Sequence, residues 1–193
     1  MRIFLLTLIL ILSFQTWTKA EDVRDFELEG MSIGDSALDY FEQSVLEKNK
    51  EYSWYDTKNF TPIAELYLSN SSTYESFQIA IKTNDKNYRI QALSGFIFYR
   101  NNDFDKCILQ LDDIASEIKG LFNNVRDTGK QTYKHSYDKS GKSNVTAIHL
   151  ILDSGDQVGI QCIDWAEKYT YLDQLRISVR TKEYIKFLDN AYN

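Results

Sequence analysis

The chain has 193 residues, with 22 Lys and Arg against 28 Asp and Glu, so its formal net charge is −6. An acidic protein has no electrostatic reason to bind nucleic acid or an anionic membrane surface, so neither partner is expected. Aromatic residues make up 14% of the sequence and there is one proline, which favours a compact domain with a β-sheet over a disordered chain.

Residues 1–20 have the three-part layout of a secretory signal peptide. Met1 and Arg2 provide a positive start, residues 3–12 are mostly apolar, and small Ala20 stands at the expected cleavage site. The apolar run is about a dozen residues long, whereas a membrane-spanning helix needs about 20, so cleavage is favoured over an anchor. We therefore expect one globular domain over residues 21–193, secreted or periplasmic, with no membrane span after cleavage.

The mature sequence opens with a short strand and a turn that leads into a helix. Residues 25–29 alternate polar and apolar side chains, which is typical of a half-buried strand. Gly30 and Gly34 then favour a tight connection, and Asp35 or Ser36 can cap the helix that follows. These four residues are predicted to shape the backbone at this point of the chain.

Further along, alternating apolar residues predict two β-hairpins and a final strand. The expected strands cover residues 77–81, 88–99, 145–152, 158–164 and 175–179. The expected helices cover residues 104–122 and 182–192. Residues 52–55 are interpreted as a short strand, residues 62–68 as one or two helical turns, and residues 123–144 as a polar connection. The fold class is therefore α+β, an antiparallel sheet of about five strands with two to three helices packed on one face.

The chain has two cysteines, Cys107 and Cys162, and two thiols in an exported protein usually form one disulfide. Cys107 shares a helical face with Leu111, whereas Cys162 alternates with Val158 and Ile160 on one face of a strand. We expect a Cys107–Cys162 disulfide between a helix and the sheet, with two separately buried thiols as the alternative. No second Cys or His lies at ligand spacing from either cysteine, so no metal site and no cofactor are predicted.

Short motifs that would indicate other chemistry are incomplete. Residues 141–143 read Gly-Lys-Ser, as at the end of a phosphate-binding loop, but Ser136 replaces the glycine required five positions earlier. His135 lies in a polar loop and is interpreted as solvated. His149 lies on an expected strand and is interpreted as a half-buried histidine without a catalytic role.

Four carboxylates, Asp156, Asp164, Glu167 and Asp173, fall near one end of the second hairpin. A glycosidase-type acid and base require two carboxyl groups that face each other across a cleft, and a pair from this set could serve. Because 28 acidic residues always offer such pairs, solvated carboxylates are the alternative.

Aromatic residues form a second candidate site. Trp54, Tyr55, Trp165 and Tyr169 could together form a flat surface that binds a sugar or a peptide. Ordinary packing in the core and at the edges of a small sheet is the alternative for the same residues.

Residues 26–41, which read FELEGMSIGDSALDYF, resemble a recurring opening of small exported proteins from marine bacteria. The similarity continues through residues 86–90, 98–99, 138–143 and 162–165, and thus covers most of the mature chain. More loosely, residues 30–36 are similar to the strand-to-helix opening of small envelope assembly lipoproteins and β-lactamase-inhibitor-like domains. The resemblance implies export, and it carries no catalytic residues, because the marine family has no assigned function.

Export, an expected disulfide and the lack of a complete catalytic motif together indicate a non-enzymatic module that binds a protein or an envelope component. The alternative is a small secreted hydrolase that uses the carboxylates within residues 156–173. A cleft that brings two of these acids together would favour the hydrolase.

Overall fold

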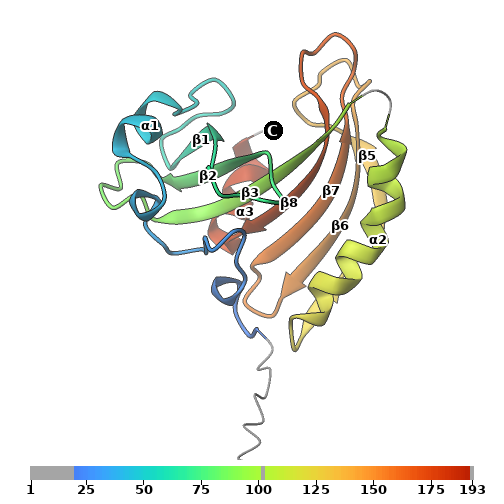
Figure 1. The fold of residues 1–193 in the computed structure, drawn as a ribbon, viewed down its shortest axis with the longest axis horizontal. Helices are drawn as coiled ribbons and strands as arrows, with labels where there is room; N and C mark the ends of the chain where they lie inside the picture. The colour runs from blue at the N-terminus through green and yellow to red at the C-terminus, as the bar shows by residue number, and fades with distance from the viewer. Residues whose placement is uncertain (1–19, 101–102, 192–193) are drawn as a thin grey trace, which may run out of the picture.

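The computed structural model describes residues 20–100 and 103–191, so the predicted signal peptide, apart from Ala20, lies outside the described residues. The strands are β1 (Phe60–Leu66), β2 (Ser76–Lys82), β3 (Ile90–Tyr99), β4 (Val125–Asp127), β5 (Gln131–Lys134), β6 (Asn144–Leu152), β7 (Gln157–Asp164) and β8 (Asp173–Arg180). They form one antiparallel sheet of 8 strands in the order β1-β2-β3-β8-β7-β6-β4, with β5 also pairing with β6. The sheet bends strongly, so that β2 and β3 run crosswise to β6 and β7 (Figure 1).

The class α+β with an antiparallel sheet is confirmed, but the prediction of about five strands is wrong. β1 occupies residues interpreted above as helical turns, and it tolerates Pro62 because it is the edge strand of the sheet. β4 and β5 form within the predicted polar connection, because both pair with the outer side of β6 and need no apolar face there. Residues 25–29 and 52–55 form no strand.

The helices are α1 (Gln43–Lys48), α2 (Asp105–Gly120) and α3 (Lys182–Ala191), with short 3₁₀ turns η1 (Val23–Asp25) and η2 (Ala37–Asp39). Ser36 caps η2 by accepting a hydrogen bond from the amide of Leu38, as its capping role predicts. The helix expected after Ser36 is broken into η2 and α1. None of the helices among the described residues is both long and apolar enough to cross a membrane.

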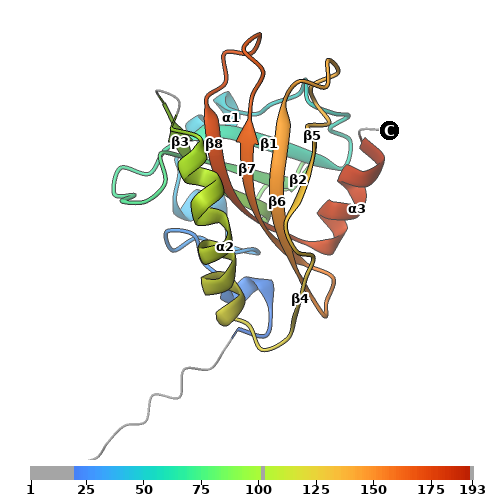
Figure 2. The same cartoon turned by 90° about the vertical axis from the view of Figure 1, so that its right-hand side faces the viewer.

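The helices do not share one face of the sheet. α1 and α2 contribute to the main core, in which Leu46 of α1 and Leu111 of α2 are fully buried. α3 and α2 lie apart on the sheet (Figure 2). α3 packs on the face opposite the main core, where Tyr184 belongs to a small cluster that includes Phe60 of β1 and Ala80 of β2. Residues on both faces of the central strand β7 are buried. An antiparallel sheet with one solvated face would instead show buried and exposed residues in alternation.

The predicted disulfide is confirmed. Cys107 of α2 and Cys162 of β7 are bonded, with their Cα atoms 5.9 Å apart and a sequence separation of 55. Both residues are fully buried in the main core. The bond fastens α2 to the middle of the sheet.

Candidate functional site

The centre of the sheet carries polar side chains on the face opposite α2. On β8, Leu175, Ile177 and Val179 point into the main core, so the alternate residues point to the other face. Strand pairing brings further polar residues and one glycine beside them. We call this set the polar face: Ser94, His149, Gly159, Gln161, Gln174, Arg176, Ser178 and Arg180.

The polar face lies between two apolar clusters on the same side of the sheet. One cluster joins β1, β2 and β3 to α3, and the other is formed by Val145, Ala147 and Ile163 with Trp165 packed against them. Between the clusters Ser94 is 2% exposed and Ser178 is 0% exposed. Buried positions at the middle of a sheet are normally apolar, so a polar strip at this place points to a ligand.

Four residues of the polar face form one row across four strands. Ser94 of β3 pairs with Ser178 of β8, which pairs with Gly159 of β7, which in turn pairs with His149 of β6. The side chains in such a row project from neighbouring positions, about 5 Å apart from strand to strand. The row therefore provides a fixed floor for whatever lies above it.

The guanidinium of Arg180 lies over Gly159. A Cβ atom on residue 159 would be 2.6 Å from Nη2 of Arg180, 2.9 Å from Oγ of Ser178 and 3.1 Å from Nδ1 of His149. Since real Cβ atoms essentially never approach other atoms to 2.6 Å, only glycine leaves room for this arrangement. The missing side chain thus brings together three polar groups from β6 and β8, the two strands that flank β7.

The second arginine of β8 lies on the other side of Ser178. Arg176 donates from Nε and Nη2 to Oγ of Ser94, at 3.1 and 3.0 Å. Its guanidinium also lies 5.5 Å from the ring centre of Phe96, in a cation–π contact. Ser94 and Gly159 pair with Ser178 from its two sides, so the two guanidinium groups lie toward opposite sides of Ser178.

Several buried nitrogens at this face have no hydrogen-bond partner. Among residues 20–100 and 103–191, the buried side-chain polar atoms without a partner are Nε and Nη2 of Arg180, Nδ1 of His149 and Nε1 of Trp165. All of them belong to the side of the sheet opposite α2. Leaving a buried donor without a partner costs about 1–3 kcal/mol, and more when the group is charged. Of these atoms, Nη2 of Arg180 and Nδ1 of His149 lie beside the same point over Gly159, and this pair is the strongest indication of a binding site.

The electrostatic environment is set by burial and by the two arginines. Burial, followed by the positive charge of Arg176, lowers the pKa of Arg180 to about 10, so its guanidinium stays charged at neutral pH. Burial, followed by the charge of Arg180, lowers the pKa of His149 to about 4, so this imidazole is neutral. Within the described part of the chain, Arg180 forms no ion pair. The centre of the polar face is therefore electropositive.

The four predicted carboxylates do not form one group. Asp164 and Asp173 lie at one end of β7 and β8, where Asp173 accepts a hydrogen bond from the amide of Trp165 at 2.8 Å. Burial raises the pKa of Asp173. Glu167 is exposed and lines, with Asp164 and others, an open hollow of about 540 Å³.

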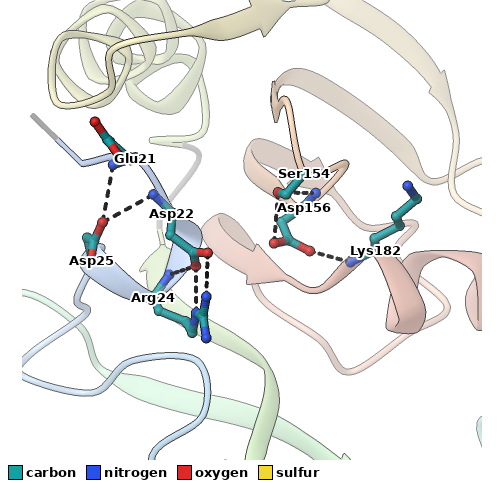
Figure 3. A network of polar contacts seen from close by, with 7 residues as sticks. All are labelled: Glu21, Asp22, Arg24, Asp25, Ser154, Asp156 and Lys182. Atoms are coloured by element: carbon teal, nitrogen blue, oxygen red, sulfur yellow. Dashed lines mark hydrogen bonds and ion pairs between the residues drawn. The ribbon is translucent and has the colours of Figure 1, made fainter.

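Asp156 lies at the other end of β7, about 25 Å along the strand from Asp164. It accepts hydrogen bonds from Oγ of Ser154 at 2.9 Å and from the amide of Lys182 at 2.7 Å (Figure 3). Paired catalytic carboxyl groups stand about 5–10 Å apart, so Asp156 cannot pair with Asp164. Because it accepts a hydrogen bond from the amide of Lys182, the first residue of α3, Asp156 has a capping role at the start of that helix.

The predicted aromatic surface is divided between two clusters. Trp165 and Tyr169 have ring centres 5.6 Å apart, and Tyr171 and His135 join them at the tips of the loops. Tyr55 instead packs beside α3, where its hydroxyl lies 2.9 Å from that of Tyr184. Trp54, its neighbour in sequence, is half-buried. No flat surface made from the four predicted aromatics is present in this arrangement.

His135 is not solvated as the sequence suggested. Its ring lies 4.4 Å from the ring centre of Trp165. Burial, followed by the charge of Arg176, lowers its pKa to about 4, although Asp138 acts in the opposite direction. His135 is therefore an uncharged ring at pH 7 that packs against Trp165 in the aromatic cluster of the loops.

A buried carboxylate that the sequence did not single out joins two loops. Asp138, in the β5–β6 loop, accepts hydrogen bonds from the hydroxyls of Ser140 and Ser143. It also forms an ion pair with Lys168 of the β7–β8 loop, with Nζ and Oδ1 2.8 Å apart. Burial acts to raise the pKa of Asp138, but the bonds from Lys168, Ser140 and Ser143 outweigh it and hold the pKa well below its usual range. The carboxylate thus fixes the loops that carry the aromatic cluster.

The turn with Gly30, Gly34, Asp35 and Ser36 has a structural role. Gly30 and Gly34 have φ values of 81° and 95°, which glycine adopts without strain. The amide of Gly34 donates to the carbonyl of Ile90 at 2.9 Å, and Ser36 donates to the carbonyl of Asn87. These bonds attach the amino-terminal segment to the start of β3.

Sequence reasoning missed the polar face, although its signal was present. Residues 174–180 read Gln-Leu-Arg-Ile-Ser-Val-Arg, an alternation that normally indicates one buried face and one solvated face. Only the pairing of β8 between β3 and β7 makes the polar half of this pattern internal.

No family model, curated protein or solved structure matches this chain.

Proposed function

We propose that the protein is an exported, non-enzymatic binding module, and that its ligand occupies the polar face. The observation that carries this proposal is that Nε and Nη2 of Arg180 and Nδ1 of His149 are buried without a partner within the described chain, with Nη2 and Nδ1 beside the same point over Gly159. A ligand that accepts hydrogen bonds from them would offset a cost that otherwise lowers the stability of the fold.

The setting supports binding over catalysis. The histidine nearest to Arg180 is neutral, and the nearest side-chain hydroxyl, that of Ser178, donates weakly to the carbonyl of Gly159 at 3.4 Å. No described residue acts on that hydroxyl as a base would in a hydrolase. We place the ligand among the components of the envelope or the extracellular space, since the leader and the disulfide favour export.

A small secreted hydrolase remains the second candidate, because Asp164 and Asp173 lie at the same end of two paired strands. Burial and the neighbouring charge of Asp164 both raise the pKa of Asp173, which suits a general acid. The hollow beside Asp164 and Trp165 would then be the substrate site.

One experiment separates the two functions. The purified protein is screened by thermal shift against organic acids, sugar phosphates and glycans, and each hit is mapped by backbone amide chemical shifts. Binding predicts shifts on β7 and β8 around Gly159 and Ser178, without turnover. Shifts confined to Asp164, Glu167 and Asp173, together with cleavage of a glycan or peptide, would establish the hydrolase and reject the binding module.

A further inference from the structure

We propose that the polar face binds an oxyanion, the carboxylate, sulfate or phosphate group of its ligand, between the Arg180 guanidinium and Ser178 above Gly159. This inference rests on the proposed function and adds the chemical class of the bound group. The three anions share the chemistry that matters here, which is a negative charge spread over oxygens that accept hydrogen bonds.

The first step concerns the donors. Nε and Nη2 are neighbours on the planar guanidinium and form the edge that binds two oxygens of one carboxylate or phosphate at once. These are the two atoms of Arg180 that are buried without a hydrogen-bond partner. The unused edge of Arg180 therefore has the geometry that oxyanion recognition requires.

The second step concerns the space beside that edge. Because residue 159 has no side chain, Nη2 of Arg180, Oγ of Ser178 and Nδ1 of His149 all approach the point where a Cβ atom would lie, at 2.6, 2.9 and 3.1 Å. The Ser178 hydroxyl can rotate from its long contact with the Gly159 carbonyl, at 3.4 Å, to donate to a bound oxygen. A second donor therefore stands next to the guanidinium.

The third step concerns charge. Arg176 acts on Arg180 as a like charge, and Asp189 of α3 acts only as the weakest of the favourable charges on it, after the tyrosines. Each arginine thus raises the electrostatic potential at the other. In a site with little solvent, this potential attracts an anion more strongly than it would at the surface.

The fourth step concerns the remaining neighbours. On β5, the Tyr133 hydroxyl lies 3.2 Å from Nε2 of Gln161 and 3.5 Å from Nε2 of His149. On α3, Tyr184 faces the arginines and is buried. Gln161 has no ionisable group, burial lowers the pKa of His149 to about 4 and burial raises the pKa of Tyr184, so at pH 7 none of these three neutralises Arg180 or repels an anion.

The test is a titration of the purified protein with sodium acetate, sulfate or phosphate in separate series, with sodium chloride used to keep the ionic strength constant. The Nε–Hε signal of Arg180 and the ring signals of His149 are followed by NMR. We expect saturable shifts with at least one anion, and the order of the affinities identifies a planar or a tetrahedral group as the preferred one.

Three variants sharpen the test. Gly159→Ala places a methyl group against Arg180, and Arg180→Met removes the charge but keeps most of the side-chain volume; each should weaken the anion at least about tenfold. Gly120→Ala is the matched control, because a Cβ there meets nothing within 4 Å, and it should bind as the wild type does. If Gly159→Ala does not fold, Arg180→Met decides the question.

Two outcomes would overturn the inference. One is the absence of any saturable shift at Arg180 with all three anions; the other is unchanged anion affinity in Arg180→Met. If a neutral ligand from the screen still shifts the amides of β7 and β8, the proposed binding function stands and only the oxyanion is rejected. If no ligand shifts them, both proposals fail.

Discussion

The guanidinium of Arg180 lies over Gly159 so closely that a Cβ atom on residue 159 would be 2.6 Å from Nη2. The two residues come from neighbouring strands, and the position of the guanidinium depends on the missing side chain of Gly159, as do the positions of the Ser178 hydroxyl and the His149 ring. A buried guanidinium held this way lowers stability unless a ligand compensates it. Functional sites often carry this kind of cost.

Replacing Arg180 with Met should therefore make the ligand-free protein more stable, by about 1–3 kcal/mol, because an apolar side chain of similar volume needs no partner. Urea unfolding at pH 7 measures the change. Arg126→Met, at an exposed position on β4, is the control and should change the free energy of unfolding by less than about 0.5 kcal/mol. A loss of stability in Arg180→Met would mean that this arginine supports the fold.

Acid should destabilise the protein through its two histidines. Both have folded pKa values of about 4 against an ordinary value of 6.5, so between these values the unfolded chain binds protons that the folded chain does not. Stability is fully present above pH 6.5 and falls as the pH drops toward 4, by about 1–2 kcal/mol for each histidine once solvent screening is allowed for. Urea unfolding at pH 7 and 4.5 should show a smaller loss in His149→Gln and in His135→Gln. Equal losses in wild type and both variants would contradict this prediction.

Removing the disulfide should lower the free energy of unfolding by roughly 4 kcal/mol, because Cys107 and Cys162 close a loop with a sequence separation of 55. The double variant Cys107→Ala/Cys162→Ala is compared with the oxidised wild type by urea unfolding. Wild type treated with a reductant should approach the variant. An unchanged midpoint in the variant would show that the bond contributes nothing to stability.

Asp156→Ala should cost about 1 kcal/mol, since the variant loses the bond to the first amide of α3, now 2.7 Å long. Thermal unfolding measures it, and Asp153→Ala in the same turn is the control, since Asp153 is exposed and makes no hydrogen bond to another described side chain. An unchanged unfolding midpoint in Asp156→Ala would show that this bond contributes nothing to the stability of α3.

Asp138→Asn should loosen the β5–β6 and β7–β8 loops, because the amide cannot replace the carboxylate in its bonds to Lys168, Ser140 and Ser143. Hydrogen exchange of the Ser140 and Ser143 amides should become faster. Glu167→Gln, an exposed acid of the β7–β8 loop, serves as the control and should leave those rates unchanged. Unchanged rates in Asp138→Asn would mean that the loops hold together without this carboxylate.

Local patterns in the sequence were enough to predict the elements that depend on neighbouring residues. The hairpins β2–β3 and β6–β7, the strand β8 and the helices α2 and α3 all lie where periodicity and turn residues placed them. The disulfide could also be predicted, because each cysteine lay on the apolar side of its own element. Strands β1, β4 and β5 were missed, since their own residues carry little pattern and edge pairing holds them in place.

The sequence by itself determined the two-sided pattern of β8 and the number and spacing of its polar residues. Only the tertiary structure decided that both faces of β8 are internal, and that Arg176 lies beside Ser94, which is 82 residues away in sequence. The physical reason is that alternation records which residues share a face, whereas strand order decides what covers that face. The role of Gly159 could not be predicted from the sequence for the same reason. Only the tertiary structure places the Arg180 guanidinium where a Cβ atom of residue 159 would lie within 2.6 Å of it.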